Sequence, residues 1–201
     1  MTAPTWLVVV GASAGGLDPF SAFIDELEKP FDAAVIFCSH RGDNVSSRDQ
    51  LTDLLARRTS LAVIDVAHGE PVRSSTIYVP RPGRHLGFSG GCFVEYDAPK
   101  DRYWRPSIDK VLENAVEAYG DRAIAVTLSG AMDDGVRGLE AVYKAGGWAF
   151  VQSPEEAAFE SMPVNAIWRN HPEMIAPVRD IAKKITDIVA TQKQEAAAAK
   201  K

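Results

Sequence analysis

Five short runs of apolar residues restrict the fold of this chain more than any other feature of its sequence. They are rich in Val, Ile, Phe and Ala, and none shows the alternation of apolar and polar residues that is typical of a half-exposed strand. Each is therefore suited to a strand that is buried on both faces. The runs occupy residues 6–10, 33–38, 61–66, 123–128 and 148–151.

The segments between these runs carry apolar residues at helical spacing. Such stripes cover residues 17–27, 51–55, 108–116 and 178–188. Buried strands that alternate with helices predict an α/β fold, in which a doubly wound, mostly parallel, Rossmann-like sheet lies between two layers of helices. One region departs from this alternation, because the runs TIYV and HLGF…CFVEY lie around a Gly-rich turn at residues 89–91. We interpret this region as a β-hairpin appended to the three-layer sheet.

Length and charge limit the class of protein. The 201 residues fit one domain, which we place at residues 1–191, and we expect the tail QKQEAAAAKK at 192–201 to be frayed or disordered. A formal net charge of -5 gives no broad basic surface, so we expect no nucleic-acid partner. No apolar run approaches the roughly 20 residues that cross a bilayer, and the start lacks a secretory signal. We therefore expect a cytoplasmic protein without membrane insertion.

The sequence also argues against a metal site. The chain has two cysteines, Cys38 and Cys92, without the CxxC spacing of metal ligands and without a disulfide framework. We interpret both as small apolar residues of the interior. No cofactor is expected.

A small-residue turn, GASAGG at residues 11–16, follows the first predicted strand. A dinucleotide-binding motif would need glycine in place of Ser13, and a phosphate-binding P-loop would need a lysine after Gly16, where Leu17 stands. The pattern G-x-S-x-G does fit, because small neighbours let a strand turn sharply into a helix and expose the serine hydroxyl. A serine in such a turn can also simply cap the helix, and the motif alone leaves both interpretations open.

A serine nucleophile needs a base and a group that orients the base. His40 directly follows the second predicted strand, while Asp133 and Asp134 follow the fourth. Parallel strands end at the same edge of a sheet, so these side chains are expected near Ser13. One aspartate could instead cap the helix that begins near Gly135. The other histidines lie in loop-like segments and fit surface or packing roles better; they are His68, His85 and His171.

Taken together, the motifs resemble the catalytic domain of CheB-type protein-glutamate methylesterases. The matching stretches are GASAGG, His40 after its strand, VAHGEPVRSSTIYVPRPGRHLGF, RPSIDKVL, AIAVTLSGAMDDGVRGLEAVYKAGG, VQSPEEAAF and SMPVNAI. The resemblance implies hydrolysis of glutamate γ-methyl esters on a chemoreceptor or signalling protein, with deamidation of some glutamines. It implies Ser13 as nucleophile, His40 as base and Asp134 as the orienting carboxylate. Backbone N–H groups of Ala14 and Met132 are the expected oxyanion donors.

Some positions depart from the family pattern. Family members in chemotaxis usually carry threonine where Ala14 stands and a Gly-Met-Gly run where this chain has residues 130–132. The segment RGDNVSS after His40 replaces a Met-Pro-containing one. The chain starts about four residues before its first strand, so we expect a stand-alone domain without a receiver domain.

Two basic residues beside the predicted edge, Arg41 and Arg105, are candidates for binding acidic residues of a protein substrate. Met162-Pro163 is expected in a loop near the cleft, as in the family, and three tryptophans are interpreted as packing residues: Trp104, Trp148 and Trp168. Two other functions remain open. One is a signalling or scaffold module that binds a partner without turnover, and the other is a protein-glutamine deamidase.

Overall fold

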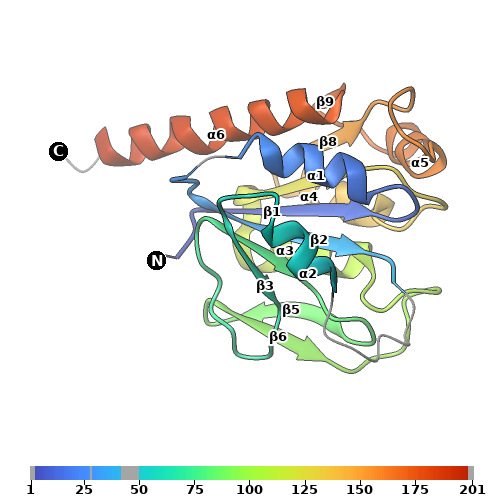
Figure 1. Cartoon of the computed structure of the whole chain (residues 1–201), viewed down its shortest axis with the longest axis horizontal. Coiled ribbons are helices and arrows are strands. Elements are labelled where there is room, and N and C mark those ends of the chain that lie inside the picture. The colour runs from blue at the N-terminus through green and yellow to red at the C-terminus, as the bar shows by residue number, and fades with distance from the viewer. Residues whose placement is uncertain (1–2, 28, 42–49, 199–201) are drawn as a thin grey trace.

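Seven parallel strands form one sheet at the centre of the molecule (Figure 1). The structure is a computed structural model that describes residues 3–27, 29–41 and 50–198. The strands run in the order β3-β4-β2-β1-β7-β8-β9. Their bounds are β1 (Trp6–Ala12), β2 (Ala33–Ser39), β3 (Ala62–Asp65), β4 (Thr76–Val79), β7 (Ala123–Thr127), β8 (Trp148–Gln152) and β9 (Met174–Ala176).

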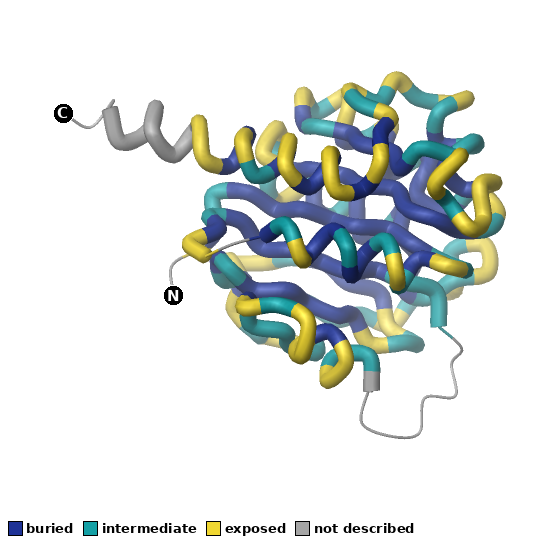
Figure 2. The backbone as a smooth tube through the Cα atoms, turned by 45° about the horizontal axis from the view of Figure 1, so that its top comes forward, coloured by how far each residue is buried: buried dark blue, intermediate teal, exposed yellow. Residues whose placement is uncertain are grey.

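Helices cover both faces of this sheet, which confirms the predicted three-layer α/β fold. One face carries α1 (Leu17–Asp25), α2 (Gln50–Ala56) and α6 (Val178–Ala198). The other carries α3 (Ile108–Tyr119), which continues into the short η1 (Gly120–Arg122), together with α4 (Val136–Lys144) and α5 (Ser161–Arg169). Figure 2 shows the strands as a buried layer between helices that are exposed on their outer sides.

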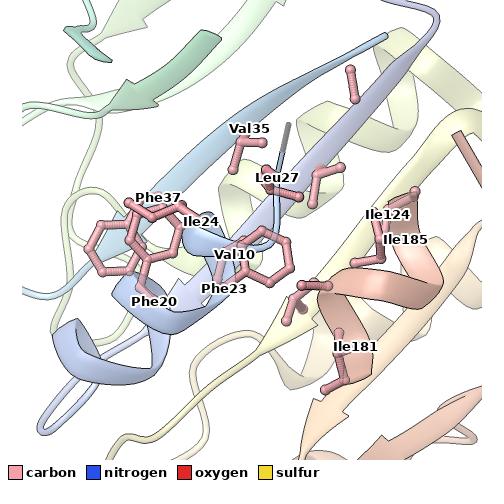
Figure 3. Close-up of a cluster of buried hydrophobic side chains, with 14 of the residues drawn as sticks. Val10, Phe20, Phe23, Ile24, Leu27, Val35, Phe37, Ile124, Ile181 and Ile185 are labelled. Atoms are coloured by element: carbon pink, nitrogen blue, oxygen red, sulfur yellow. The ribbon is translucent and has the colours of Figure 1, made fainter. Parts of the chain in front are cut away.

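Each face of the sheet has its own hydrophobic cluster because successive side chains of a strand point to opposite faces. In β1, Val8 and Val10 belong to the cluster under α1 and α6, whereas Leu7 and Val9 belong to the cluster under α3 and α4. The first cluster is shown in Figure 3. There Phe20 of α1 stacks on Phe37 of β2, with ring centroids 3.7 Å apart. The unbroken apolar runs in the sequence follow from this burial on both faces.

The predicted hairpin around residues 89–91 is confirmed, but the run TIYV does not belong to it. The strands β5 (His85–Ser89) and β6 (Cys92–Tyr96) form an antiparallel two-stranded sheet of their own, seen at the bottom of Figure 1. Its Leu86 and Phe93 pack in the cluster under α3. The run TIYV is instead β4, a fully buried strand that pairs in parallel with β2 and β3. Placing TIYV beside the hairpin was therefore wrong.

Two elements near the carboxyl-terminal end were not predicted. The strand β9 extends the sheet at one edge, beside β8. Met162 and Pro163 lie in the first turn of α5 and are buried, so the prediction of a loop there was wrong. A proline is tolerated in the first turn of a helix, where its missing N–H has no helical partner to lose.

The last helix continues past the boundary we expected for the domain. α6 extends to Ala198, so its backbone includes residues 192–198 of the predicted tail. The domain boundary itself stays a prediction. Among the described residues, no helix is both long enough and apolar enough to cross a membrane. Cys38 is buried, which raises the pKa of its thiol, and Cys92 is partly buried; both are free.

The topology marks one place on the carboxyl edge of the sheet. β1 and β7 are neighbours, yet the helix after β1 covers one face of the sheet and the helix after β7 covers the other. The connections after the two strands therefore lead to opposite faces of the sheet, and open α/β sheets bind ligands at such a switch point. Ser13 follows β1 at this point, and Ser129 lies just after β7.

A close approach between α3 and α4 depends on one glycine. A Cβ added to Gly138 of α4 would lie 2.5 Å from Cβ of Leu112 in α3. We expect Gly138→Ala to lower the free energy of unfolding by about 1–3 kcal/mol, because the two helices must move apart. Gly87→Ala is the control, since a Cβ there meets its neighbours at 3.5 Å or more. Urea denaturation of both variants measures the difference, and equal stability would contradict the proposed clash.

Candidate active site

Ser13 lies at the turn from β1 into α1. The Ser13 N–H donates to the carbonyl of Ser129 at 3.0 Å, which ties this turn to the end of β7. Gly15 has a φ of +70°, a conformation that glycine adopts without steric cost. The Ser129 hydroxyl donates to the carbonyl of Ala14 at 2.9 Å and also accepts the N–H of Phe159. The turn is thus fixed from the neighbouring strand, and the Ser13 side chain stays partly exposed.

His40 lies beside Ser13 at the end of β2. The backbone N–H of His40 donates to the carbonyl of Ala12, which keeps the ends of β1 and β2 paired. The ring nitrogen Nδ1 is 3.1 Å from the Ser13 hydroxyl oxygen, and Nε2 is 2.7 Å from Oδ2 of Asp134. The structure therefore brings together the three residues Ser13, His40 and Asp134 in one chain of hydrogen bonds. The side chain of His40 is only 2% exposed and that of Asp134 6%, so water has little access to the pair.

Asp134 is seated on the N-terminus of α3. Its Oδ2 accepts the Ile108 N–H at 2.8 Å, and its Oδ1 accepts the Asp109 N–H at 3.0 Å. The Ser107 hydroxyl is 2.9 Å from Oδ1 of Asp134. The first N–H groups of a helix have no partner within the helix, so a carboxylate at this position satisfies them and is stabilised by them.

These contacts set the charge state of Asp134. Burial acts to raise the pKa of its carboxyl, but the hydrogen bonds from His40, Asp109 and Ile108 outweigh burial and hold the pKa below its ordinary value. Asp134 is therefore ionised at neutral pH. An ionised carboxylate fixes the proton of His40 on Nε2, so Nδ1 is left as an acceptor for the Ser13 hydroxyl.

Asp133, the neighbouring aspartate, has a different environment. It forms ion pairs with Arg102 at 2.5 Å and with Arg169 at 3.4 Å, on the outside of the molecule. The helix α4 has Gly135 at its N-cap position, and the backbone N–H groups of Gly135 and Gly138 donate to Oδ1 of Asp109. Capping by Asp133 or Asp134, which the sequence left open, does not occur.

The segment after β7 passes directly beside Ser13. A Cβ added to Gly130 would lie 3.0 Å from Cβ of Ser13, so only a residue without a side chain fits there unchanged. Met132 has a φ of +70°, in the left-handed region that favours glycine. Met132 is the last of residues 130–132, which correspond to the Gly-Met-Gly run of the family pattern, so it occupies the place of the second glycine. Met132 therefore has a backbone conformation that glycine adopts more readily.

The expected oxyanion donors differ in their availability. Within the described residues, the N–H of Ala14 has no hydrogen-bond partner, as an oxyanion donor requires. The N–H of Met132 donates to the Ser161 hydroxyl at 3.1 Å, and the Met132 carbonyl accepts from Asn165. A role of Met132 as donor would require it to release Ser161. The Ala131 N–H, one residue earlier, has no partner in the described part of the chain.

Both arginines predicted to bind substrate are engaged within the protein. The guanidinium of Arg41 is partly buried and donates to the carbonyl of Pro80. Arg105 pairs with Asp97 at 2.6 Å and donates to the carbonyl of Ala98. Neither contact places a guanidinium against Ser13. All of the altered segment RGDNVSS except Arg41 lies outside the described residues.

Two contributors near the site were not identified from the sequence. Ser107 was part of the motif RPSIDKVL, but no pattern indicated that its hydroxyl reaches Asp134. Trp104, interpreted from the sequence only as a packing residue, stacks face to face on the His40 ring, with centroids 3.8 Å apart. The other two tryptophans differ from each other: Trp148 packs partly buried against the core, whereas Trp168 is 85% exposed, so a packing role for Trp168 was wrong.

The remaining histidines make contacts away from this chain of hydrogen bonds. His85 is buried and lies 3.0 Å from the Pro99 carbonyl, and the exposed His68 contacts Glu95. His171 lies near the ring of Tyr143. These contacts agree with the packing and surface roles expected for them.

Comparison with known proteins gives the same family as the motifs. The sequence matches the model of the CheB methylesterase family over residues 8–185. The chain belongs to the CheB methylesterase family. The fold agrees with that of the Thermotoga maritima CheB methylesterase catalytic domain, with a TM-score of 0.86 and 28% identity; the match covers 92% of this chain and 98% of that one.

Curated relatives of this CheB-family chain carry related names. It is 30% identical over 182 residues to protein-glutamate methylesterase/protein-glutamine glutaminase 2 of Anaeromyxobacter dehalogenans, covering 90% of this chain and 53% of that protein. It is also 30% identical to protein-glutamate methylesterase FrzG of Myxococcus xanthus, covering 89% and 53%. A Leptospira interrogans protein named putative protein-glutamate methylesterase/protein-glutamine glutaminase is 29% identical, and the match covers 88% of this chain and 91% of that protein. The chain thus spans about half the length of the first two relatives.

Proposed function

We propose that this protein hydrolyses glutamate γ-methyl esters on a chemoreceptor or another signalling protein. The observation that carries the proposal is the unbroken chain of contacts from the Ser13 hydroxyl through His40 to Asp134. A binding module has no need for a buried imidazole held between a hydroxyl and an ionised carboxylate. The family membership and the names of the relatives support the same activity.

The first step forms an acyl-enzyme. Ser13 Oγ attacks the carbonyl carbon of the ester while its proton passes to Nδ1 of His40. The ring then carries a positive charge, which Asp134 stabilises through its contact with Nε2. When the tetrahedral intermediate collapses, the bond to the methoxy group breaks, and methanol leaves with the proton from Nδ1. The ring is oriented oppositely to that of the chymotrypsin-type triad, in which Nε2 faces the serine.

The second step releases the product. A water molecule takes the place of methanol, gives a proton to Nδ1 and attacks the acyl carbon. Collapse of the second intermediate breaks the bond to Ser13 Oγ and returns the proton to it. The products are methanol and a free glutamate side chain, and no cofactor takes part in this balance.

The oxyanion of each intermediate needs N–H donors near Ser13. The Ala14 N–H follows the nucleophile in the turn and is available in the free protein. We assign the second donor to the segment after β7, because Gly130 packs against Ser13. The Ala131 N–H fits this role with less rearrangement than the Met132 N–H, which is already bonded to Ser161.

The proposal can be tested with a methylated protein fragment. Purified protein is incubated with a receptor cytoplasmic fragment whose glutamates carry methyl esters, and released methanol is measured. A second fragment that carries glutamine at the same positions measures ammonia release, so that deamidation is scored separately. In parallel, a fluorophosphonate probe is added and the modified residue is located by mass spectrometry.

We expect methanol release and labelling at Ser13. Binding of the methylated fragment without methanol release, together with no labelling of Ser13, would support the non-catalytic scaffold module and contradict the proposal. Ammonia release without methanol release would identify a deamidase instead.

A further inference from the structure

The indole of Trp104 covers one face of the His40 ring. The two rings are parallel within 4°, and their centroids are 3.8 Å apart. The edges of the same ring are held by Ser13 at Nδ1 and by Asp134 at Nε2. Two hydrogen bonds in the ring plane fix two points of the imidazole but leave it free to tilt about the line between them. A flat surface against the ring face removes this remaining freedom.

Trp104 is itself held firmly by backbone contacts. Its N–H donates to the carbonyl of Asp101 at 3.0 Å, and its carbonyl accepts the Asp101 N–H at 3.1 Å. The Asp101 carboxylate lies 3.0 Å from the Ser107 hydroxyl and pairs with Arg137. Ser107 in turn contacts Asp134. Residues 101–107 therefore position both the carboxylate that orients His40 and the indole that covers it.

The face-to-face geometry suits a charged imidazole better than a neutral one. Neutral aromatic rings prefer offset or edge-to-face contacts, because their electron-rich faces repel each other. A cation over the face of an indole is instead attracted to it, and Trp is the side chain with the strongest such attraction. The stack is therefore more favourable after His40 has taken the Ser13 proton than before. An interaction that strengthens in this way lowers the barrier of the chemical step.

We propose that Trp104 is a positioning residue, which keeps the His40 ring aligned between Ser13 and Asp134 and stabilises its protonated form. This inference rests on the proposed esterase function for its effect on rate. The alignment of the ring is a property of the free protein. It can therefore be measured whether or not a substrate is known.

The kinetic test compares three variants on the methylated fragment. We expect Trp104→Leu to lower kcat about 10- to 100-fold and to change KM less than about 3-fold, since the contact acts on the base and not on the substrate. Trp104→Phe, which keeps a ring face, should recover kcat to within about 5-fold of the parent. Trp168→Leu is the control, because this tryptophan is exposed and makes no ring contact with His40 in the described structure; it should match the parent.

The second test uses the free protein. The proton between His40 Nε2 and Asp134 gives a downfield ¹H NMR signal, assigned by its loss in His40→Ala. We expect this signal in the parent and in Trp104→Phe, and expect it to broaden or vanish in Trp104→Leu while the rest of the spectrum stays folded. Trp104→Met replaces Trp104→Leu if the latter does not fold.

The outcomes separate the two proposals. A parent without activity on any ester contradicts the proposed function, and the NMR comparison then decides the role of Trp104 alone. If Trp104→Leu raises KM and leaves kcat unchanged, Trp104 contacts substrate and the positioning role is wrong. An unchanged kcat together with an unchanged downfield signal overturns it as well.

Discussion

Ser13→Ala is expected to reduce methanol release on the order of 10⁶-fold, because without the hydroxyl no acyl-enzyme can form. The side chain makes no other contact than the one to Nδ1 of His40 among the described hydrogen bonds, so the variant should fold like the parent. Rates on the methylated fragment and circular dichroism of both proteins measure the two effects.

Ser39→Ala is the matched control for this substitution. Ser39 ends β2 directly before His40 and pairs across the ladder with Ala12, so it belongs to the same edge of the sheet. Its replacement should leave the rate within about 3-fold of the parent, because among the described residues its hydroxyl makes no hydrogen bond to Ser13, His40 or Asp134. A Ser13→Ala variant with appreciable activity would remove Ser13 from the mechanism.

Asp134→Asn should reduce kcat on the order of 10⁴-fold, as loss of the orienting carboxylate does in the chymotrypsin-type triad. All four contacts to Asp134 come from groups that can donate, at Ser107, Ile108, Asp109 and His40. Whichever way an asparagine turns, its NH₂ group faces a backbone N–H. The variant therefore also leaves buried donors unsatisfied, and we expect a lower free energy of unfolding by about 1–3 kcal/mol.

Asp133→Asn is the matched control for Asp134→Asn, because it makes the same change at the adjacent residue. Asp133→Asn removes only partly exposed ion pairs with Arg102 and Arg169, which contribute little to stability. It should keep kcat within about 3-fold and the free energy of unfolding within about 1 kcal/mol of the parent. Steady-state rates and thermal unfolding of the pair test this, and equal losses in both variants would show that Asp134 has no special role.

The main sheet could be predicted because its strands carry a strong signal. A strand buried on both faces needs an unbroken apolar run, and β1 and β2 have such runs. The run TIYV has the same property, but its neighbour along the chain is a hairpin. Which strand it pairs with is set by contacts between residues far apart in sequence, such as Ile36 and Tyr78. The three residues of β9 are too few to show any periodicity.

The chain of hydrogen bonds was predictable for a similar reason. Ser13, His40 and Asp134 each follow a strand of the same parallel sheet, so topology alone brings them to one edge. Trp104 and Ser107 lie in an irregular loop, where no periodicity tells which way a side chain points. Likewise, Arg41 and Arg105 donate hydrogen bonds to loop carbonyls, and Arg105 also pairs with Asp97. The sequence alone does not show which groups an arginine in a loop will contact.

The position of Asp134 at the N-terminus of α3 affects how the active site responds to ionic strength. Its negative charge is balanced by fixed backbone dipoles and by the imidazole, and no exposed basic side chain is needed. Mobile ions weaken interactions between charges that face the solvent, with a screening length of about 10 Å at 0.1 M, and have little effect on buried ones. The acid–base properties of the site should therefore stay constant when the surrounding medium changes, and only the encounter with a charged partner should respond.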